Sequence, residues 1–290
     1  MKIKTIAIFV LIVAAFAAGL LLKEHFFEFY DSLNKQVAEM QKINIGSVIS
    51  EVGKQMLTPP PLQVLGAEKQ VDLLKSQIIL QTNVQRHQNG SLPALIENKR
   101  LDEAASAKAS DMFEKQYFEH ISPLGLDPGK LVQNHGYEFI VAGENLILGN
   151  FSSEEEVVDD WMASSGHRAN ILNNRYTEIG VAIVKGTYQG QTVWMGVQEF
   201  GFPLSACPSP DNILKNTIDS DKQQLDFLYS ELGTNKKQID SLDQTSPTYS
   251  QMADDYNKLV AQYEALSSDT KKIISNYNNQ VSIFNNCVSE

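Results

Sequence analysis

The carboxy-terminal part of the chain carries a heptad pattern that restricts its fold more than any other feature. From Leu214, steps of four and three residues reach mostly apolar positions: Ile218, Asp221, Leu225, Leu228, Leu232, Asn235, Ile239 and Leu242. A second set runs through Met252, Tyr256, Leu259, Tyr263, Leu266, Thr270, Ile273, Tyr277, Gln280, Phe284 and Cys287. Residues 244–248, with Pro247 among them, interrupt the pattern. Residues 207–290 are therefore predicted to form two long helices with a coiled-coil seam, folded back as an antiparallel hairpin.

The two cysteines of the 290-residue chain, Cys207 and Cys287, fit this hairpin. Two cysteines cannot form a four-cysteine zinc site or a disulfide-dense scaffold, but they can form one bridge in an oxidising compartment. Their midpoint is residue 247, in the break between the helices, so an antiparallel hairpin brings them together at its open end. We predict a Cys207–Cys287 disulfide there; the alternative is two unpaired thiols.

An apolar segment near the amino terminus bears on the compartment. Lys2 and Lys4 precede an uncharged stretch at residues 6–22, which is just long enough to cross a bilayer. Residues 1–23 are predicted to be an uncleaved membrane anchor with a single span, or alternatively a signal peptide cleaved near Ala15-Phe16-Ala17 and followed by secretion. In both cases the lysines stay on the cytoplasmic side, so the bulk of the chain is expected outside the cytoplasm.

Residues 24–69 are predicted to form a helical stalk followed by a proline-rich linker. Apolar residues recur at spacings of three and four in two runs, 26–40 and 48–56. Pro59-Pro60-Pro61 then stops any helix and favours an extended linker. The stalk either packs against the domain that follows or is a spacer without a partner.

Residues 70–206 have the pattern of one compact α+β domain. Helices are predicted at about 70–88, 101–117 and 153–164, the last one capped by Ser152 or Ser153. Two strands follow at 179–185 and 192–200, joined by a hairpin loop over 186–191. Helices first and strands last favour a layered α+β domain over a doubly wound parallel sheet.

Four segments of this domain resemble, in order and spacing, the CAP superfamily (cysteine-rich secretory proteins, antigen 5 and pathogenesis-related 1 proteins; the SCP domain), and its bacterial branch above all. They are 117–123 (Tyr-Phe-Glu-His-Ile-Ser-Pro), 142–146 (Ala-Gly-Glu-Asn-Leu), 161–172 (Trp-Met-Ala-Ser-Ser-Gly-His-Arg-Ala-Asn-Ile-Leu) and 197–201 (Val-Gln-Glu-Phe-Gly). The match covers about 75–204 and begins where Asn83 and Arg86 resemble the Asn-x-x-Arg of the family's first helix.

The resemblance implies a three-layer α-β-α sandwich around a small antiparallel sheet, with a shallow cleft lined in many members by two histidines and two acids. His120 matches the first histidine and Glu144 the first acid. The chain departs from the pattern at the second acid, which is Ser164 here, and at the second histidine, which is Arg175. His167, the histidine of the bacterial branch, is expected to reach the same cleft from the end of the third helix.

These side chains admit a chemical and a structural interpretation. His120 and His167 are suited to zinc or another divalent metal, and with Glu144 they could hold a metal-bound water that attacks a carbonyl. Without a metal, either histidine could act as a general base. In the structural alternative, His120 only bonds the chain around Ser122, Glu144 satisfies backbone donors beside Gly143, and His167 caps a helix.

The predicted function follows from these features together. The favoured hypothesis is a binding module, anchored through residues 6–22, whose cleft or coiled coil engages an unidentified cell-envelope or surface ligand. The alternative is a metal-dependent hydrolase that uses the His120, Glu144 and His167 cleft, and a third is a structural role in which the hairpin self-associates. A net charge of −11 argues against nucleic acid as a partner, because that requires a basic face.

Overall fold

The computed structural model describes residues 32, 34, 35, 38, 53–64, 66–243 and 245–289. The predicted membrane segment at 6–22 and most of the predicted stalk lie outside these residues. Within the described ranges, no helix combines the length and the apolar character that crossing a bilayer requires. The chain divides into two compact units, one formed mainly by residues 53–208 and the other mainly by residues 209–284.

The first unit is organised around a six-stranded mixed sheet. Its centre is antiparallel: β4 (Phe139–Gly149) and β5 (Glu178–Tyr188) both pair with β6 (Gln191–Pro203). Its edges are parallel, because β1 (Gln55–Leu57) and β2 (Leu62–Val64) pair with β4, and β3 (Ile96–Glu97) pairs with β5. The expectation of a small antiparallel sheet therefore holds for the centre only.

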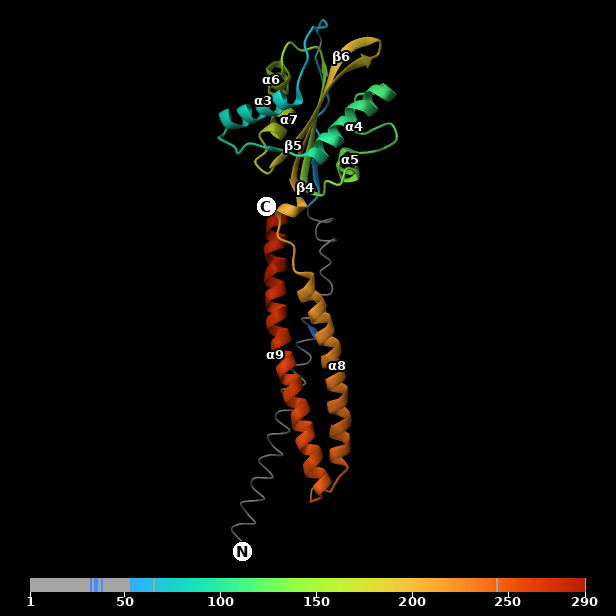
Figure 1. Cartoon of the computed structure of the whole chain (residues 1–290), viewed down its shortest axis with the longest axis vertical. Helices are drawn as coiled ribbons and strands as arrows, with labels where there is room; N and C mark the ends of the chain where they lie inside the picture. The colour runs from blue at the N-terminus through green and yellow to red at the C-terminus, as the bar shows by residue number, and fades with distance from the viewer. Residues whose placement is uncertain are drawn as a thin grey trace. The chain divides into compact units, whose positions relative to one another are not determined.

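Helices cover both faces of the sheet, as expected for an α-β-α sandwich (Figure 1). One face carries α3 (Lys75–Gln88), α6 (Glu154–Ala163) and α7 (Ser165–Ile171), and the other carries α4 (Lys99–Lys115) and α5 (Pro128–Asn134). An apolar core joins α4 to the sheet: Ala105, Ala109 and Met112 pack with Leu146, Met195 and Val197. Sequence patterns located α3, α4 and α6, whereas the short helices α5 and α7 and the long strand β4 were not predicted.

Local sequence explains where several elements begin. The hydroxyl of Ser153 accepts a hydrogen bond from the Glu156 amide, which confirms the predicted cap of α6. The β5–β6 turn is tighter than the predicted loop over 186–191, because Gln189 and Gly190 adopt φ values of 47° and 78°. Positive φ at both central residues is typical of a two-residue hairpin turn, so the strands continue up to it.

The segment at 55–64 differs from the predicted helix and linker. Residues 55–57 and 62–64 are strands of the sheet, and Pro59-Pro60-Pro61 lies between them. The sheet therefore begins before the predicted boundary at residue 70. Pairing with β4 supplies backbone partners that helical periodicity in residues 48–56 does not reveal, because these partners lie more than 80 residues away.

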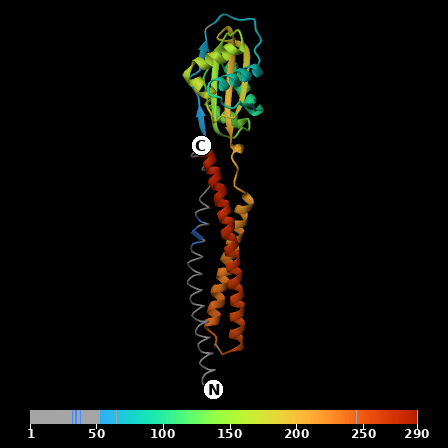
Figure 2. The same ribbon diagram turned by 90° about the vertical axis from the view of Figure 1, so that its left-hand side faces the viewer.

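The second unit is the predicted antiparallel hairpin of α8 (Asn212–Asp240) and α9 (Pro247–Ser289), which run side by side in both views (Figures 1 and 2). Predicted seam residues form its core, including Ile218, Leu225, Tyr263 and Tyr277. Two polar seam positions pair with each other: Thr270 donates to Asp221 over 3.0 Å. Self-association through the hairpin stays a prediction.

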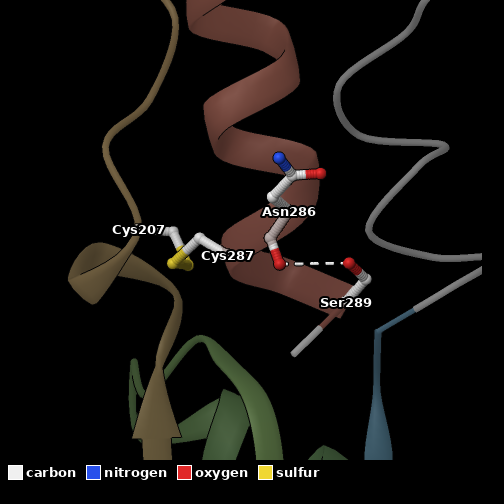
Figure 3. Close-up of a disulfide and its surroundings, with 4 residues drawn as sticks. All are labelled: Cys207, Asn286, Cys287 and Ser289. Carbon is white, nitrogen blue, oxygen red and sulfur yellow. Dashed lines mark hydrogen bonds between the residues drawn. A yellow bond between two sulfur atoms is a disulfide. The ribbon is translucent and has the colours of Figure 1, made fainter.

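The predicted disulfide between Cys207 and Cys287 is present (Figure 3). It joins the segment before α8 to the last turns of α9 and encloses a sequence separation of 80 residues. Ser289 donates to the carbonyl of Asn286 beside it, over 3.0 Å. The bridge therefore closes the open end of the hairpin, as the position of Pro247 midway between the cysteines indicated.

Candidate functional site

Two of the predicted cleft residues are in direct contact. His120 follows α4 in a loop, and Glu144 lies in the middle of β4. Nδ1 of His120 and Oε1 of Glu144 are 2.6 Å apart, and the two side chains are 11% and 0% exposed. The first histidine and the first acid of the family pattern thus form a pair in which Glu144 is buried and His120 is partly buried.

The second ring nitrogen of His120 also has an oxygen partner. Nε2 lies 2.5 Å from the carbonyl oxygen of Pro59. A carbonyl only accepts hydrogen bonds, so Nε2 of His120 is the donor to Pro59. The structural interpretation of His120, in which it bonds the chain around Ser122, misses this partner, which lies 61 residues away.

His167 and Ser164 form a second pair, near the junction of α6 and α7. Ser164 lies between the two helices with an extended backbone, and its Oγ is 2.8 Å from Nδ1 of His167. Nε2 of His167 is buried and has no hydrogen-bond partner within the described part of the chain. Burial, with a smaller contribution from the charge of His120, lowers the pKa of His167 to about 4. His167 is therefore a neutral imidazole near pH 7.

The sequence analysis missed a second buried acid, Glu199. It lies directly opposite Glu144 in the β4–β6 ladder, and both residues are 0% exposed. Burial raises the pKa of Glu199 well above its ordinary value, and the neighbouring Glu144 raises it further. Its sequence signal was a charged residue inside the run 193–200, which is apolar except for Glu199 and Gln198 and is buried throughout.

Lys108 is the second residue that sequence reasoning missed. Its side chain comes from α4 and is 3% exposed, and Nζ donates to the His120 carbonyl over 2.6 Å. Burial lowers its pKa, while the charges of Glu144 and Glu199 act in the opposite direction. Lys108 therefore fixes the loop that carries His120 and supplies a positive charge facing the two acids.

The side-chain amides of Asn145, Asn170 and Gln198 form a hydrogen-bond network next to the site. Asn145 donates to the His167 carbonyl over 3.2 Å and to Gln198 over 3.1 Å. Asn170 donates to the side chain of Asn145 over 3.0 Å, and Gln198 donates to Thr82 over 2.8 Å. Gln198 is thus fully buried within this network, which connects α3, β4, α7 and β6.

The donor set does not fit the expected divalent metal. Both ring nitrogens of His120 are engaged by oxygens, which leaves only Nε2 of His167 as an unpartnered imidazole nitrogen of the pair. In the described ranges, no group of three or more histidine, cysteine, aspartate or glutamate side chains has a geometry that could hold a metal ion. We derive no step through a metal.

A surface pocket of about 530 Å³ opens beside His120. Besides His120, it is lined by Met56, Thr58, Glu119, Ile121, Asp127 and Pro128. Strand β1, the loop around His120 and the start of α5 thus contribute its walls. The pocket combines apolar surface with two carboxylates, which is a surface suited to binding a ligand.

Comparison with known proteins finds a family similarity over part of the chain. The profile of the CAP, or cysteine-rich secretory protein, family matches residues 81–200. The chain is 39% identical over 119 residues to the uncharacterized protein YkwD of Bacillus subtilis (strain 168), and this covers 41% of this chain and 46% of YkwD. It is 35% identical over 115 residues to the uncharacterized membrane protein YlbC of the same organism, covering 39% of this chain and 32% of YlbC.

Among solved structures, an extracellular protein containing a SCP domain from Bacillus anthracis str. Ames is similar, with 31% identity and a TM-score of 0.37. The similarity covers 43% of this chain and 39% of that one. This chain spans less than half the length of each of these relatives. The matched residues include His120, Glu144, Ser164 and His167, and residues 81–200 of this chain are therefore similar to the cysteine-rich secretory protein (CAP) family.

Proposed function

We propose that this protein is an extracytoplasmic binding module of the cell envelope, and that its ligand is received at the His120–Glu144 site. The observation that carries the proposal is a concentration of buried polar atoms without partners in the described structure. Oε2 of Glu144, Nε2 of His167 and both carboxyl oxygens of Glu199 are such atoms, apart from the contact between the two carboxyl groups and the contact of His167 with the Leu146 backbone.

Unpaired buried polar atoms are costly, because each costs about 1–3 kcal/mol in lost solvation. Native proteins therefore keep few of them, and those that remain call for an explanation such as a binding role. Here one of them belongs to Glu144, which contacts His120, and His120 lines the pocket described above. A polar ligand that enters beside His120 would meet a preformed, charged site.

The geometry favours binding over hydrolysis. Ser164 and His167 are within hydrogen-bond distance, but an activated serine needs a third group that orients the histidine through its other nitrogen. Nε2 of His167 lacks such a partner in the described residues. The buried acids Glu144 and Glu199 instead lie directly opposite each other on the neighbouring strands β4 and β6.

Three features support the proposed location. The sequence begins with a charged and apolar segment typical of a membrane anchor or signal peptide. The Cys207–Cys287 disulfide fits an oxidising compartment. The similar Bacillus anthracis protein is extracellular, and YlbC is described as a membrane protein.

Co-sedimentation with isolated cell envelopes tests the proposal. The purified full chain, Glu144→Gln and His87→Ala are compared, where His87 is an exposed histidine of α3 and serves as the control. We expect Glu144→Gln to weaken binding at least tenfold, because it removes the charge that pairs with His120, and His87→Ala to bind like the unaltered chain. Equal binding by all three, with circular dichroism showing folded protein, would contradict the proposal.

A further inference from the structure

Residues 55–64, which we call the strap, lie along the outer edge of β4. In the strap, β1 pairs Gln55–Leu57 with Val141–Gly143, and β2 pairs Leu62–Val64 with Ile147–Gly149, both in parallel. The intervening strap residues 58–61 therefore pass the centre of β4 at 144–146, where Glu144 lies. The strap crosses the candidate site.

At the prolines, side chains of the domain replace the β-ladder as the hydrogen-bond partners of the strap. Four strap residues, 58–61, pass three residues of β4, and proline has no N–H with which to continue the ladder. Strap carbonyls are bound by side chains of the domain instead. Pro59 accepts from Nε2 of His120 over 2.5 Å, and Leu57 accepts from Nδ2 of Asn170 over 3.1 Å.

Two glycines allow the strap to approach this closely. A Cβ added to Gly166, in the first turn of α7, would lie 2.7 Å from Cβ of Pro59. A Cβ added to Gly149 would lie 2.5 Å from the carbonyl oxygen of Val64. Pro59 is itself buried, whereas Pro60 is exposed. The surface is therefore shaped to hold one proline ring in an extended backbone.

We propose that the groove formed by the β4 edge, His120, Asn170 and Gly166 is a binding site for extended, proline-containing polypeptides, and that the strap is its built-in occupant. The hydrogen bonds named above all involve backbone atoms of the strap, so another peptide with a proline at the same place can make them. Adding a strand to a sheet edge is an established mode of peptide recognition. This proposal rests on the proposed function, because it names the ligand class of the same site.

Because the strap belongs to the same chain, it competes with any external peptide for the groove. Tethering a ligand by a short linker gives it an effective concentration of about 1 mM, which a free peptide must overcome. The connection after the strap, at residues 66–70, is exposed. It can therefore be cut without removing any residue of the protein.

The first experiment uses the full chain, purified in mild detergent, with a protease site inserted after Ala67. The probe is a fluorescent peptide with the sequence of residues 53–66. After cleavage and equilibration with excess probe, we expect the cut protein to bind it at least tenfold more tightly than the uncut protein does. A probe with Pro59→Gly should bind at least fivefold more weakly, and one with Gln63→Ala, an exposed strap position, should bind unchanged. Equal, undetectable binding by cut and uncut protein would overturn the proposal.

The second experiment needs no cleavage and uses Gly166→Ala in the full chain. Alanine stabilises a helix more than glycine does, but at position 166 its methyl group would collide with Pro59. We expect amide hydrogen exchange in residues 55–64 to accelerate at least tenfold while α3 and α4 stay protected. Unchanged exchange in the strap would contradict the proposed fit of the groove to proline.

Envelopes stripped of protein by proteolysis separate this proposal from the proposed function. If the ligand is a polypeptide, the protein cut after Ala67 should co-sediment with untreated envelopes and should fail to do so with stripped ones. Binding that persists on stripped envelopes and is still lost in Glu144→Gln would overturn the peptide proposal and leave the binding function standing.

Discussion

Glu144 and Glu199 lie directly opposite one another on β4 and β6, and both are completely buried. Two adjacent carboxylates in such a place repel each other, so one of them retains its proton. Burial and this neighbour raise the pKa of Glu199 well above its ordinary value, which identifies it as the protonated partner. Glu144 is the member of the pair that contacts His120, with Oε1 2.6 Å from Nδ1.

The free energy of unfolding of Glu199→Gln should depend less on pH than that of the unaltered protein. A raised pKa in the folded state contributes stability that is complete below the ordinary pKa of 4.5 and is lost as the pH rises. Glutamine has no such proton to lose. The free energy of unfolding of Glu199→Gln should therefore exceed that of the unaltered protein by an amount that grows from about pH 5 to pH 8. Urea unfolding across this range measures the difference, with the exposed Glu114→Gln as control. Parallel curves for all three proteins would contradict the assignment.

Arg86→Lys should destabilise the domain, although it keeps the charge. The Arg86 guanidinium is fully buried and donates to the carbonyls of Pro93, Ile171 and Asn173 over 2.8–3.0 Å. Lysine cannot reach these carbonyls in the same geometry, and the loss should lower the free energy of unfolding by roughly 3 kcal/mol. Denaturant unfolding tests this, and Arg100→Lys, whose arginine makes one exposed bond to Gly136, should cost less than about 1 kcal/mol.

Two glycine substitutions should have effects of opposite sign. A Cβ on Gly180 of β5 would lie 2.1 Å from a backbone atom of Leu101, so Gly180→Ala must push α4 away from the sheet. Gly233 of α8 has open space around it, so Gly233→Ala should stabilise the helix by about 0.5–1 kcal/mol. Thermal unfolding followed by circular dichroism measures both. A Gly180→Ala variant as stable as the original would refute the close packing of α4 on β5.

Removing the disulfide should destabilise the hairpin. The Cys207→Ser, Cys287→Ser double variant opens a loop of 80 residues, and the chain-entropy relation gives a loss of roughly 4 kcal/mol. Far-ultraviolet circular dichroism during urea unfolding measures this loss of stability, because the hairpin consists of two long helices. The oxidised and the reduced original protein provide the matched comparison. Equal midpoints with and without the bridge would show that helix packing alone sets the stability of the hairpin.

The candidate site was predicted in part. Motif residues located His120, Glu144, Ser164 and His167, and the structure joins them as two pairs. The partners that define their chemistry were missed: Pro59 on His120, Glu199 opposite Glu144, and Lys108 beneath the His120 loop. Each of these contacts depends on which strands are neighbours, and sequence spacing does not state that.

The sequence by itself determined those features that depend on local periodicity and on position along the chain. Heptad spacing predicted α8 and α9, the break at Pro247 predicted their reversal, and its place midway between the cysteines predicted the disulfide. Tertiary structure decided the place of the strap, which resembled a stalk and linker because its strands are short and its prolines stop helices. Its backbone partners lie on β4, more than 80 residues away, so its role at the site exists only once the sheet has formed.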